Sequence, residues 1–505
     1  MSSVPAPRAG RREWIGLGII ALPCLLYSMD LTVLNLAVPR LSADLRPTSS
    51  QLLWIVDIYG FVLAGLLIPM GALGDRIGRR KVLLIGAALF GAASVFAAMS
   101  RSAGMLIGAR AILGVAGATI APSTLSLIRN MFLDARQRTT AISVWIASYS
   151  VGGSIGPLLG GVLLDHFWWG SVFLAGVPVM LLLLVLGPWL LPEFRDPNAG
   201  RIDVPSAIES LAAVLLVIYG VKRFAQGSGG NESIAAIAIG LGIGALFVRR
   251  QTRLGDPLID LRLFRLPSFS AALAAYAIAT FAGFGILLFI SQFLQGVRGL
   301  SPLAAGIALM PISLSFIVGS FLSPVLGRRV GAAALMGIGM MVAVVGFLLL
   351  AWIDTDSGIA IVVAACVLYS LGLAPLFTLT TAMIVGAAPP ERAGAAAALS
   401  ETGSELGGAL GIALLGSIGA AAYRSAMATI IPAGLPANVS TLARGTLGGA
   451  IALAKSLPSA TAATLVRAAQ SAFCHSLDAT ALSGAVILVA AAIAITPRLR
   501  AVRAA

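Results

Sequence analysis

Long, nearly uninterrupted apolar runs dominate this 505-residue sequence and constrain its fold more than any other feature. A helix needs about 20 apolar residues to cross the hydrocarbon core of a bilayer. Fourteen runs reach or approach that length, and several contain interior Gly and Pro, which membrane helices tolerate. The expected spans are residues 14–38, 52–74, 82–100, 104–128, 139–163, 171–192, 205–224, 233–249, 269–295, 303–326, 331–353, 358–386, 394–422 and 479–497.

The composition excludes other classes of protein. Only 11% of the residues are charged and 58% are hydrophobic, whereas about 25% of an ordinary soluble domain is charged. This balance argues against a soluble enzyme and against a disordered or fibrous chain. The net charge of +14 would suggest a nucleic-acid partner in a soluble protein. Because the basic residues lie between the apolar runs, we expect loops at an anionic membrane surface and no nucleic-acid partner.

The distribution of basic residues predicts the orientation of the chain. An even number of spans places both termini on one side, and the loops on that side carry most of the Lys and Arg. The positive-inside rule therefore predicts cytoplasmic termini, with tails at 1–13 and 498–505. The first run is too long for the core of a signal peptide, so we interpret it as the first span.

Polar linkers divide the spans into groups of six, two and six. We expect an N-terminal six-helix bundle over 14–192, a linker with two extra helices over 193–265, and a C-terminal six-helix bundle over 266–497. The last region includes a long extracytoplasmic segment, 423–478, that is partly amphipathic around 445–473 and predicts a short helical hairpin, with either a structural or a gating role. Two halves of this kind suggest a transporter with a site near the membrane midplane.

Ionisable residues inside the spans are candidates for function, because each costs at least about 2.5–3.5 kcal/mol to insert. Asp30 lies deep in the first span, where it can bind either a proton or a cationic substrate by competition. The alternative is a buried acid bonded to a neighbouring helix. Asp57 lies about one turn inside the second span, and its alternative is a partly hydrated residue at a helix end.

Three further ionisable residues complete this set. Glu401 and Glu405 are four residues apart and share one helix face, which disfavours their joint ionisation and suits a proton carrier or cation site. The alternative for Glu401 is a solvated position near the cytoplasmic end. Arg110 needs a partner, and Asp30 is the natural candidate across a helix interface; the alternative is an Arg bonded to backbone carbonyls.

Aromatic residues could form the wall of an apolar cavity and attract flat or quaternary cations. Packing or lipid-facing positions are the alternative for each. The candidates are Trp54, Tyr59, Phe281, Phe284, Phe289, Phe293 and Phe377, of which the first four are predicted substrate contacts. The sequence has no phosphate-binding loop, no H-E-x-x-H motif and no metal-ligand spacing, so we expect no cofactor, no metal site and an ion gradient as the energy source.

Several motifs resemble those of the major facilitator superfamily. The stretch Gly71-Ala-Leu-Gly74-Asp75-Arg76-Ile-Gly78-Arg79-Arg80-Lys81 is similar to its loop 2–3 signature, a glycine-rich reverse turn at a cytoplasmic seam. The segment around Arg110 resembles the span 4 signature. Gly152-Gly153-Ser-Ile-Gly156-Pro157-Leu-Leu-Gly160-Gly161 resembles the span 5 signature of exporters, a closely packed hinge helix. The segments around Asp30 and around Glu401 and Glu405 resemble spans 1 and 13 of the 14-span drug:proton antiporters.

The resemblance covers essentially the whole chain and implies an all-α integral membrane protein with the major facilitator fold: two six-helix bundles, two extra helices and 14 transmembrane helices. It implies proton coupling at Asp30, Arg110 and Glu405, and substrate contacts at Asp30, Asp57, Glu401 and Glu405. It also implies gating by Gly71, Asp75, Arg76, Arg79, Gly156 and Pro157. The chain departs from the family pattern in lacking an acid in span 10, which bears on the transport of dications, and in lacking an Asp between Gly319 and Arg329.

We therefore expect a proton-coupled antiporter, not an enzyme, that exports lipophilic cationic drugs, dyes and antiseptics. Its partners would be these small molecules, protons and the lipid bilayer, and we expect a monomer in the cytoplasmic (inner) membrane of a bacterium. The alternatives are a narrow-spectrum antibiotic exporter of the same fold, a tetracycline-type exporter, an uptake transporter, and a membrane-embedded enzyme or sensor.

Overall fold

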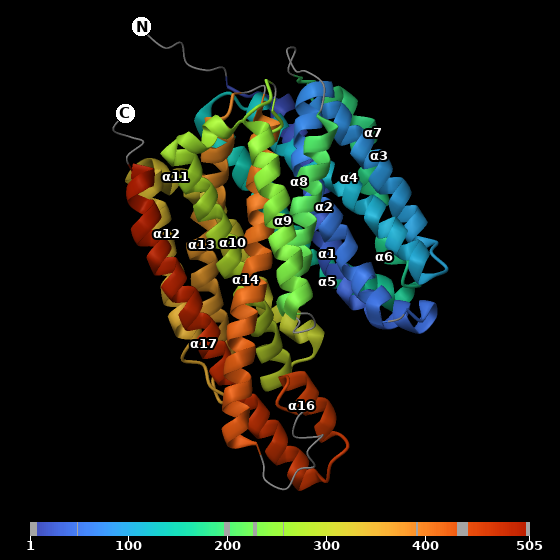
Figure 1. The fold of residues 1–505 in the computed structure, drawn as a ribbon, viewed down its shortest axis with the longest axis vertical. Coiled ribbons are helices and arrows are strands. Elements are labelled where there is room, and N and C mark those ends of the chain that lie inside the picture. Colours follow the sequence, from blue (N-terminus) through green and yellow to red (C-terminus); the bar gives the residue numbers. More distant parts are fainter. Residues whose placement is uncertain are drawn as a thin grey trace.

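The computed structural model describes residues 8–47, 49–195, 203–225, 230–255, 257–389, 392–431 and 443–500, and no strand occurs within these ranges. Within the same ranges, fourteen helical segments are long and apolar enough to cross a membrane. The predicted all-helical membrane fold with 14 spans is therefore confirmed. Figure 1 shows that α1 begins and α17 ends at the same end of the helix bundle, as an even number of spans requires.

The N-terminal half forms one bundle with its own apolar core. Its buried residues come from all of its helices, the single turn α6 included, and examples are Ile20, Leu113 and Ile142. The helices are α1 (Arg11–Leu45), α2 (Ser49–Ile77), α3 (Arg79–Ala98), α4 (Ala103–Met131), α5 (Ala135–His166), α6 (Ser171–Leu174) and α7 (Gly176–Leu190). The sixth predicted span is thus divided between a single turn, α6, and the longer α7.

The C-terminal half forms a second bundle around residues such as Ala279, Met340 and Leu477. Its helices are α10 (Pro267–Gln292), α11 (Pro302–Val330), α12 (Ala332–Leu350), α13 (Ile359–Ala387), α14 (Ala393–Ile430), α16 (Leu447–Ala454) and α17 (Ser459–Arg500). A π-helical turn, η2 (Phe293–Val297), ends α10, and a 3₁₀ turn, η1 (Leu261–Arg265), precedes it.

The two halves repeat the same packing order. In the first half α1 packs on α5, α4 lies between α2 and α3, and α3 contacts α7. In the second half α10 packs on α14, α13 lies between α11 and α12, and α12 contacts α17. The halves meet where α2 contacts α14 and where α5 contacts α11, which are equivalent pairs under this correspondence. Such an internal repeat is typical of transporters whose site lies between the two halves.

The two extra helices, α8 (Val204–Ala225) and α9 (Gly230–Gln251), form a hairpin in front of the seam between the halves (Figure 1). Helix α8 packs on both α2 and α14. Phe61 and Ala64 of α2 meet Val214 and Ile218 of α8, with Leu406 of α14 alongside. The hairpin therefore covers one side of the contact between the two halves, a position that the sequence analysis did not predict.

Two helices are much longer than a membrane requires. Helix α14 has 38 residues and α17 has 42, which correspond to about 57 and 63 Å at 1.5 Å per residue. The hydrocarbon core is about 30 Å thick, so both helices extend well beyond it. The last span, predicted to begin at residue 479, instead belongs to a helix that begins at Ser459. Helix α16 packs on this extension at the end of the molecule remote from the termini (Figure 1).

Candidate functional site

An ion pair between α1 and α4 lies at the centre of the N-terminal bundle. The guanidinium Nη1 of Arg110 donates to Oδ2 of Asp30 at 2.6 Å, and only 1% of the Arg110 side chain and 14% of the Asp30 side chain are exposed. The partnership expected from the sequence is thus present in the structure. Removing one member of such a buried pair leaves an uncompensated charge, at a cost of about 3–5 kcal/mol.

Arg110 also donates from its two other guanidinium nitrogens to α2. Its Nε donates to the carbonyl of Ile55 at 3.1 Å and its Nη2 to that of Val56 at 3.4 Å. Its guanidinium carbon lies 4.8 Å from the centre of the Tyr59 ring, a cation–π contact. The carbonyl contacts proposed as the alternative for Arg110 therefore coexist with the ion pair. One side chain of α4 joins α1 and α2 through a hydrogen bond from each of its three guanidinium nitrogens.

The two glutamates of α14 are each held by a tyrosine. Tyr27 of α1 donates its hydroxyl to Oε1 of Glu405 at 2.9 Å, across the interface between the halves. Tyr276 of α10 donates to Oε1 of Glu401 at 3.4 Å. Glu401 is only 9% exposed, so the alternative of a solvated position for it is wrong. Glu405 thus contacts the N-terminal bundle and Glu401 the C-terminal bundle, so these two acids of α14 lie at the seam between the halves.

Tyrosine rings connect the ion pair with Glu405. The Tyr27 ring centre lies 6.2 Å from that of Tyr59 and 5.4 Å from that of Tyr149, and Tyr149 packs on Trp145 at 4.8 Å. None of Tyr27, Tyr149 and Tyr276 was predicted as a site residue. Only Tyr27 left a signal in the sequence, since it lies three residues before Asp30 and so shares its helix face.

The remaining predicted substrate contacts differ in their surroundings. Asp57 is half-buried on α2. Trp54 is 40% exposed and packs edge-on against Phe61. Phe284 is 50% exposed and lies against the backbone of α14 at Gly408, while the Phe281 carbonyl lies against Gly411. Phe281 and Phe284 thus support the packing of α10 on α14, whereas Tyr59 is fully buried beneath Arg110.

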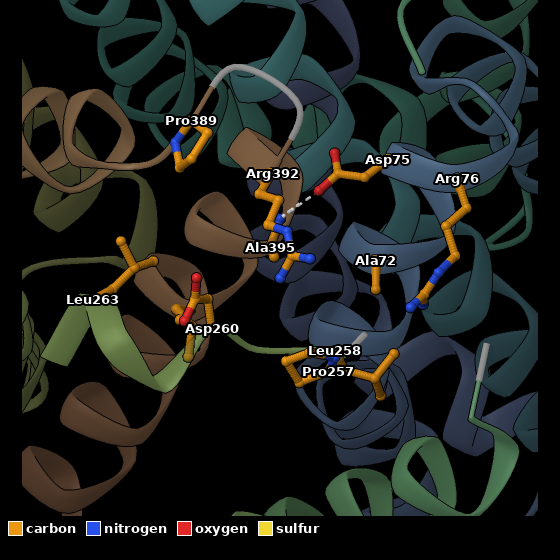
Figure 2. Close-up of a pocket in the computed structure, with 11 residues that line it drawn as sticks. Ala72, Asp75, Arg76, Pro257, Leu258, Asp260, Leu263, Pro389, Arg392 and Ala395 are labelled. Carbon is orange, nitrogen blue, oxygen red and sulfur yellow. Dashed lines mark hydrogen bonds between the residues drawn. The ribbon is translucent and has the colours of Figure 1, made fainter. Parts of the chain in front are cut away.

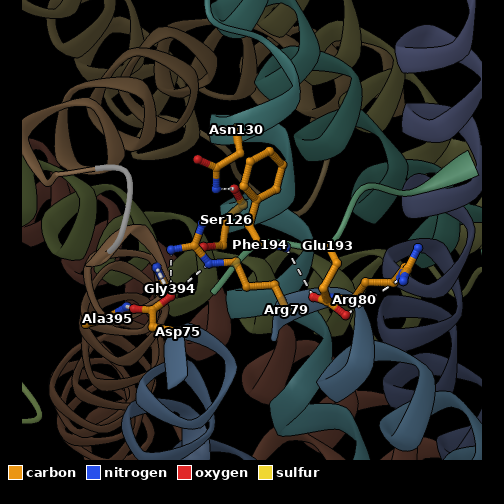
Figure 3. A network of polar contacts seen from close by, with 9 residues as sticks. All are labelled: Asp75, Arg79, Arg80, Ser126, Asn130, Glu193, Phe194, Gly394 and Ala395. Carbon is orange, nitrogen blue, oxygen red and sulfur yellow. Dashed lines mark hydrogen bonds and ion pairs between the residues drawn. The ribbon is translucent and has the colours of Figure 1, made fainter. Parts of the chain in front are cut away.

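The loop 2–3 signature forms a polar contact between the halves (Figure 3). Asp75 accepts hydrogen bonds from the backbone N–H groups of Gly394 and Ala395, both at 3.1 Å, at the start of α14. It also pairs with Arg79 at 2.7 Å. A carboxylate at a helix N-terminus is stabilised by the helix dipole and by the unpaired N–H groups there. Asp75 of the first half therefore closes the seam against the second half.

The reverse turn predicted for this signature is wrong over most of its length. Helix α2 continues to Ile77, so Gly71 and Gly74 lie inside it. The chain turns only at Gly78, whose φ of 116° favours glycine. Gly71 is needed for a different reason: a Cβ there would lie 2.6 Å from the carbonyl oxygen of Gly394. Gly71 allows α2 and α14 to touch, and Gly78 alone forms the turn.

Glu193, which the sequence analysis did not select, holds the other side of this corner. Its carboxylate accepts from the backbone N–H groups of Arg80 and Lys81 at 3.1 Å and so caps α3. Figure 3 shows Glu193 beside Arg80. Arg80 in turn donates to the carbonyls of Pro188 and Leu191, both at 3.0 Å. These bonds attach the end of α7 to the start of α3 within the first half.

A pocket opens beside the Asp75 contact, where the linker from the extra helices reaches the seam (Figure 2). Leu258 and Leu263 of the linker are buried there, and Asp260, Arg76 and Arg392 line the pocket. Gln251 accepts from the backbone N–H of Leu258 at 2.7 Å. The predicted gating residue Arg76 thus faces the linker as well as the seam.

The linker is held by an ion pair at the base of the hairpin. Arg250 donates to Oδ1 of Asp203 at 2.9 Å, and Ser206 donates to the same carboxylate. The hydrogen bond from Arg250 holds the pKa of Asp203 well below its usual range. This pair ties the start of α8 to the end of α9.

The glycines of the span 5 signature bring α5 against α1. A Cβ on Gly152 would lie 2.1 Å from the carbonyl oxygen of Leu25, and one on Gly153 would lie 3.2 Å from the Ser28 hydroxyl. Gly156 is buried in the same helix, and the side chain of Pro157 lies outside the described residues. The close packing expected of this helix is present at Gly152.

Comparisons with known proteins agree with this architecture. The family described as "Major Facilitator Superfamily" matches residues 20–412. The multidrug efflux pump LfrA of Mycolicibacterium smegmatis is 43% identical over 96% of both chains. The methyl viologen resistance protein SmvA of Salmonella typhimurium is 38% identical over 94% of this chain and 95% of its own. The solved structure of the human organic anion transporter MFSD10 shares the fold, with a TM-score of 0.63 at 18% identity over 94% of this chain and 99% of its own.

Proposed function

This chain belongs to the major facilitator superfamily, within its drug-efflux members, and from that premise we propose that it exports lipophilic cations in exchange for protons. It is a multi-pass membrane transporter and not an enzyme. We further propose that it resides in the cytoplasmic membrane of a bacterium as a monomer, with both termini in the cytoplasm.

The buried pair of Asp30 and Arg110 carries this proposal. A carboxylate in a dry site is stable as an anion only while a cation faces it. A proton on Asp30 removes that anion and leaves Arg110 charged and buried with neutral partners, such as the carbonyls of Ile55 and Val56 and the Tyr59 ring. The resulting cost, about 3–5 kcal/mol, favours any rearrangement that gives Arg110 another partner. Proton binding and helix movement are thereby coupled.

The glutamates of α14 provide a second place where protons and cations compete. Glu405 faces the N-terminal half through Tyr27, and Glu401 lies one turn away and faces Tyr276. Two carboxylates at this spacing disfavour joint ionisation, so one proton or one organic cation relieves their repulsion. We propose that the drug cation takes this place when the site faces the cytoplasm and that protons displace it when the site faces outward.

The contact of Asp75 with α14 supplies the matching gate. It holds the halves together at the end of the bundle that we assign to the cytoplasm. Opening that end must break these two hydrogen bonds, while the bonds of Glu193 and Arg80 remain within the first half. The halves can therefore rock as units about the central acids, as alternating access requires.

The test is transport in proteoliposomes under an imposed pH gradient, inside acidic or inside alkaline. The probes are ethidium as a monocation, methyl viologen as a dication and a neutral drug. We expect uptake of ethidium only when the vesicle interior is acidic, because protons that leave the vesicle then drive the exchange. We expect Asp30→Asn to lose this uptake. Methyl viologen tests the transport of dications, which the absence of an acid in span 10 disfavours and the similarity to SmvA favours.

The matched control is Asp165→Asn, which removes a carboxylate from the same half. The Asp165 side chain is 72% exposed and pairs with Arg40 at 3.3 Å on the surface, where such pairs contribute little. We expect this variant to transport as the unmodified protein does. Equal transport with and without a pH gradient, or full gradient-driven transport by Asp30→Asn, would show that the proposal is wrong.

A further inference from the structure

We propose that Tyr27 is a positioning residue that makes the contact between the two halves depend on the charge of Glu405. This inference rests on the proposed function and adds to it a specific link between the proton sites. Tyr27 belongs to α1 of the first half and Glu405 to α14 of the second. The bond of 2.9 Å from the Tyr27 hydroxyl to Oε1 of Glu405 therefore crosses the seam in the middle of the helices.

The surroundings of Tyr27 leave its hydroxyl little choice of position. The side chain is 9% exposed. Its ring packs edge-on against Tyr149 at 5.4 Å and lies 6.2 Å from Tyr59, which in turn packs on Arg110 at 4.8 Å. Because the ring is held by neighbours of its own half, the hydroxyl is directed at the acid of the other half. The donor is therefore fixed within the first half, and its acceptor moves with the second half.

The strength of the bond depends on the state of the acceptor. A phenol that donates to a carboxylate anion forms a charge-assisted hydrogen bond, about twice as strong as one to a neutral group. A proton or an organic cation on Glu405 removes that advantage. The hydrogen bond between α1 and α14 is then strong when Glu405 is ionised and binds no cation. It is weak when Glu405 binds a proton or an organic cation. Occupation of one acid is thereby converted into looser contact between the halves.

The position of Tyr27 also joins the two proton sites. Tyr27 and Asp30 are three residues apart on α1, so the Tyr27 side chain and the Asp30 carboxylate that pairs with Arg110 of α4 share one face of α1. The ionisable groups that surround the bond are Asp30, Arg110 and Tyr59 from the first half, Tyr149 of α5, and Glu401 on α14. The Tyr27 hydroxyl donates from α1 to Glu405, while Arg110 of α4 is engaged with Asp30.

The test uses Tyr27→Phe, which keeps the ring and its packing and removes only the hydroxyl. The readout is the distance between spin labels at Phe167 and Trp352, which are 56% and 82% exposed on the two halves at the end opposite Asp75, measured as a function of pH. Loss of a donor to the anion makes Glu405 bind a proton more readily. We expect the midpoint of the pH-dependent distance change to move upward by about one pH unit.

The control is Tyr149→Phe, which removes a hydroxyl from a neighbouring ring that packs on Tyr27. We expect its pH midpoint to match the unmodified protein. An unchanged midpoint in Tyr27→Phe, or the same displacement in both variants, would overturn the inference. If ethidium transport proves independent of the pH gradient, the proposed function fails; if transport stays proton-coupled but the midpoint does not move, only the role of Tyr27 fails.

Discussion

Neutralising Asp75 should open the end of the transporter that this residue now closes. In Asp75→Asn the side chain keeps its shape but loses its charge and one of its two acceptor oxygens. The carboxylate now accepts from the N–H groups of Gly394 and Ala395, both at 3.1 Å, and pairs with Arg79 at 2.7 Å. An asparagine can accept from only one of the two N–H groups, because its other terminal atom is a donor.

The magnitude follows from separating contacts between the halves from contacts within one half. Arg79 lies in the same half as Asp75, so the loss of their ion pair destabilises the open and closed conformations alike. Only the contacts with α14 change the balance between them. The charge at the helix N-terminus contributes about 1 kcal/mol and one lost hydrogen bond to a charged group about 1.5 kcal/mol. The closed conformation should therefore lose about 2–3 kcal/mol, a thirtyfold or larger change in the population ratio.

The assay is the distance between spin labels at Leu133 and Val330, measured by double electron–electron resonance. These residues are 47% and 51% exposed and lie on different halves at the end that Asp75 closes. The native cysteines are buried and should react poorly with the label: Cys24, Cys366 and Cys474. We expect a single short distance in the unmodified protein and a long distance as the major population in Asp75→Asn.

Asp134→Asn provides the matched control for this experiment. Asp134 caps α5 at the same end of the molecule and accepts from Arg136 and Gln137 within its own half. These hydrogen bonds hold its pKa below the usual range, so at neutral pH it is charged like an ordinary surface Asp. Asparagine is also a good N-cap, so the helix should persist. If Asp75→Asn leaves the distances unchanged, or if Asp134→Asn changes them equally, the contact with α14 is not the gate.

Three further predictions follow from other parts of the structure. Arg110→Lys should abolish gradient-driven transport although the charge is kept, because one ammonium cannot reproduce the three separate contacts of the guanidinium; full transport would contradict this. Gly152→Ala should lower the melting temperature of the solubilised protein by the equivalent of about 1–3 kcal/mol, since its Cβ would lie 2.1 Å from a backbone oxygen, whereas Gly161→Ala, with nothing within 4 Å, should not. Asp203→Asn should lower the melting temperature at neutral pH. Arg250 lowers the pKa of Asp203 in the folded protein, so the stabilisation by this pair is complete above about pH 4 and is lost as the pH falls further. The difference in melting temperature between the variant and the unmodified protein should therefore shrink at low pH. A difference that persists there would contradict the prediction.

The membrane fold was predictable because span length and apolarity are local properties of the chain. The fourteen spans follow from runs of residues, and the pairing of Asp30 with Arg110 follows from the cost of an unpaired charge in oil. The ends of α14 and α17 were not predictable in this way. Outside the bilayer a helix needs no apolar run, so the amphipathic pattern around 445–473 predicted a separate short hairpin and not one helix that continues from Ser459 through the last span.

The partners of the α14 acids could not be predicted for a different reason. Tyr27 and Tyr276 meet Glu405 and Glu401 through contacts between helices that are far apart in the sequence. A tyrosine in an apolar run has the same local pattern whether it packs in lipid or donates to an acid. The aromatic residues predicted from the sequence include Phe284, which packs against α14 but has no hydroxyl to donate to an acid at the seam.

Helix α14 contributes to both the gate and the central acids, so the two sites are coupled through one helix. Gly394, which binds Asp75, and Glu405, which binds Tyr27, are eleven residues apart on α14, or about 16 Å along a continuous helix. Both contacts join α14 to the first half, so a movement of α14 as a rigid rod changes them together. A proton or drug that weakens the contact at Glu405 therefore reduces the force that holds the gate, and no relay through side chains is needed. Double substitution of Asp75 and Tyr27 should then show non-additive effects on the distance distributions, because the two bonds oppose the same displacement.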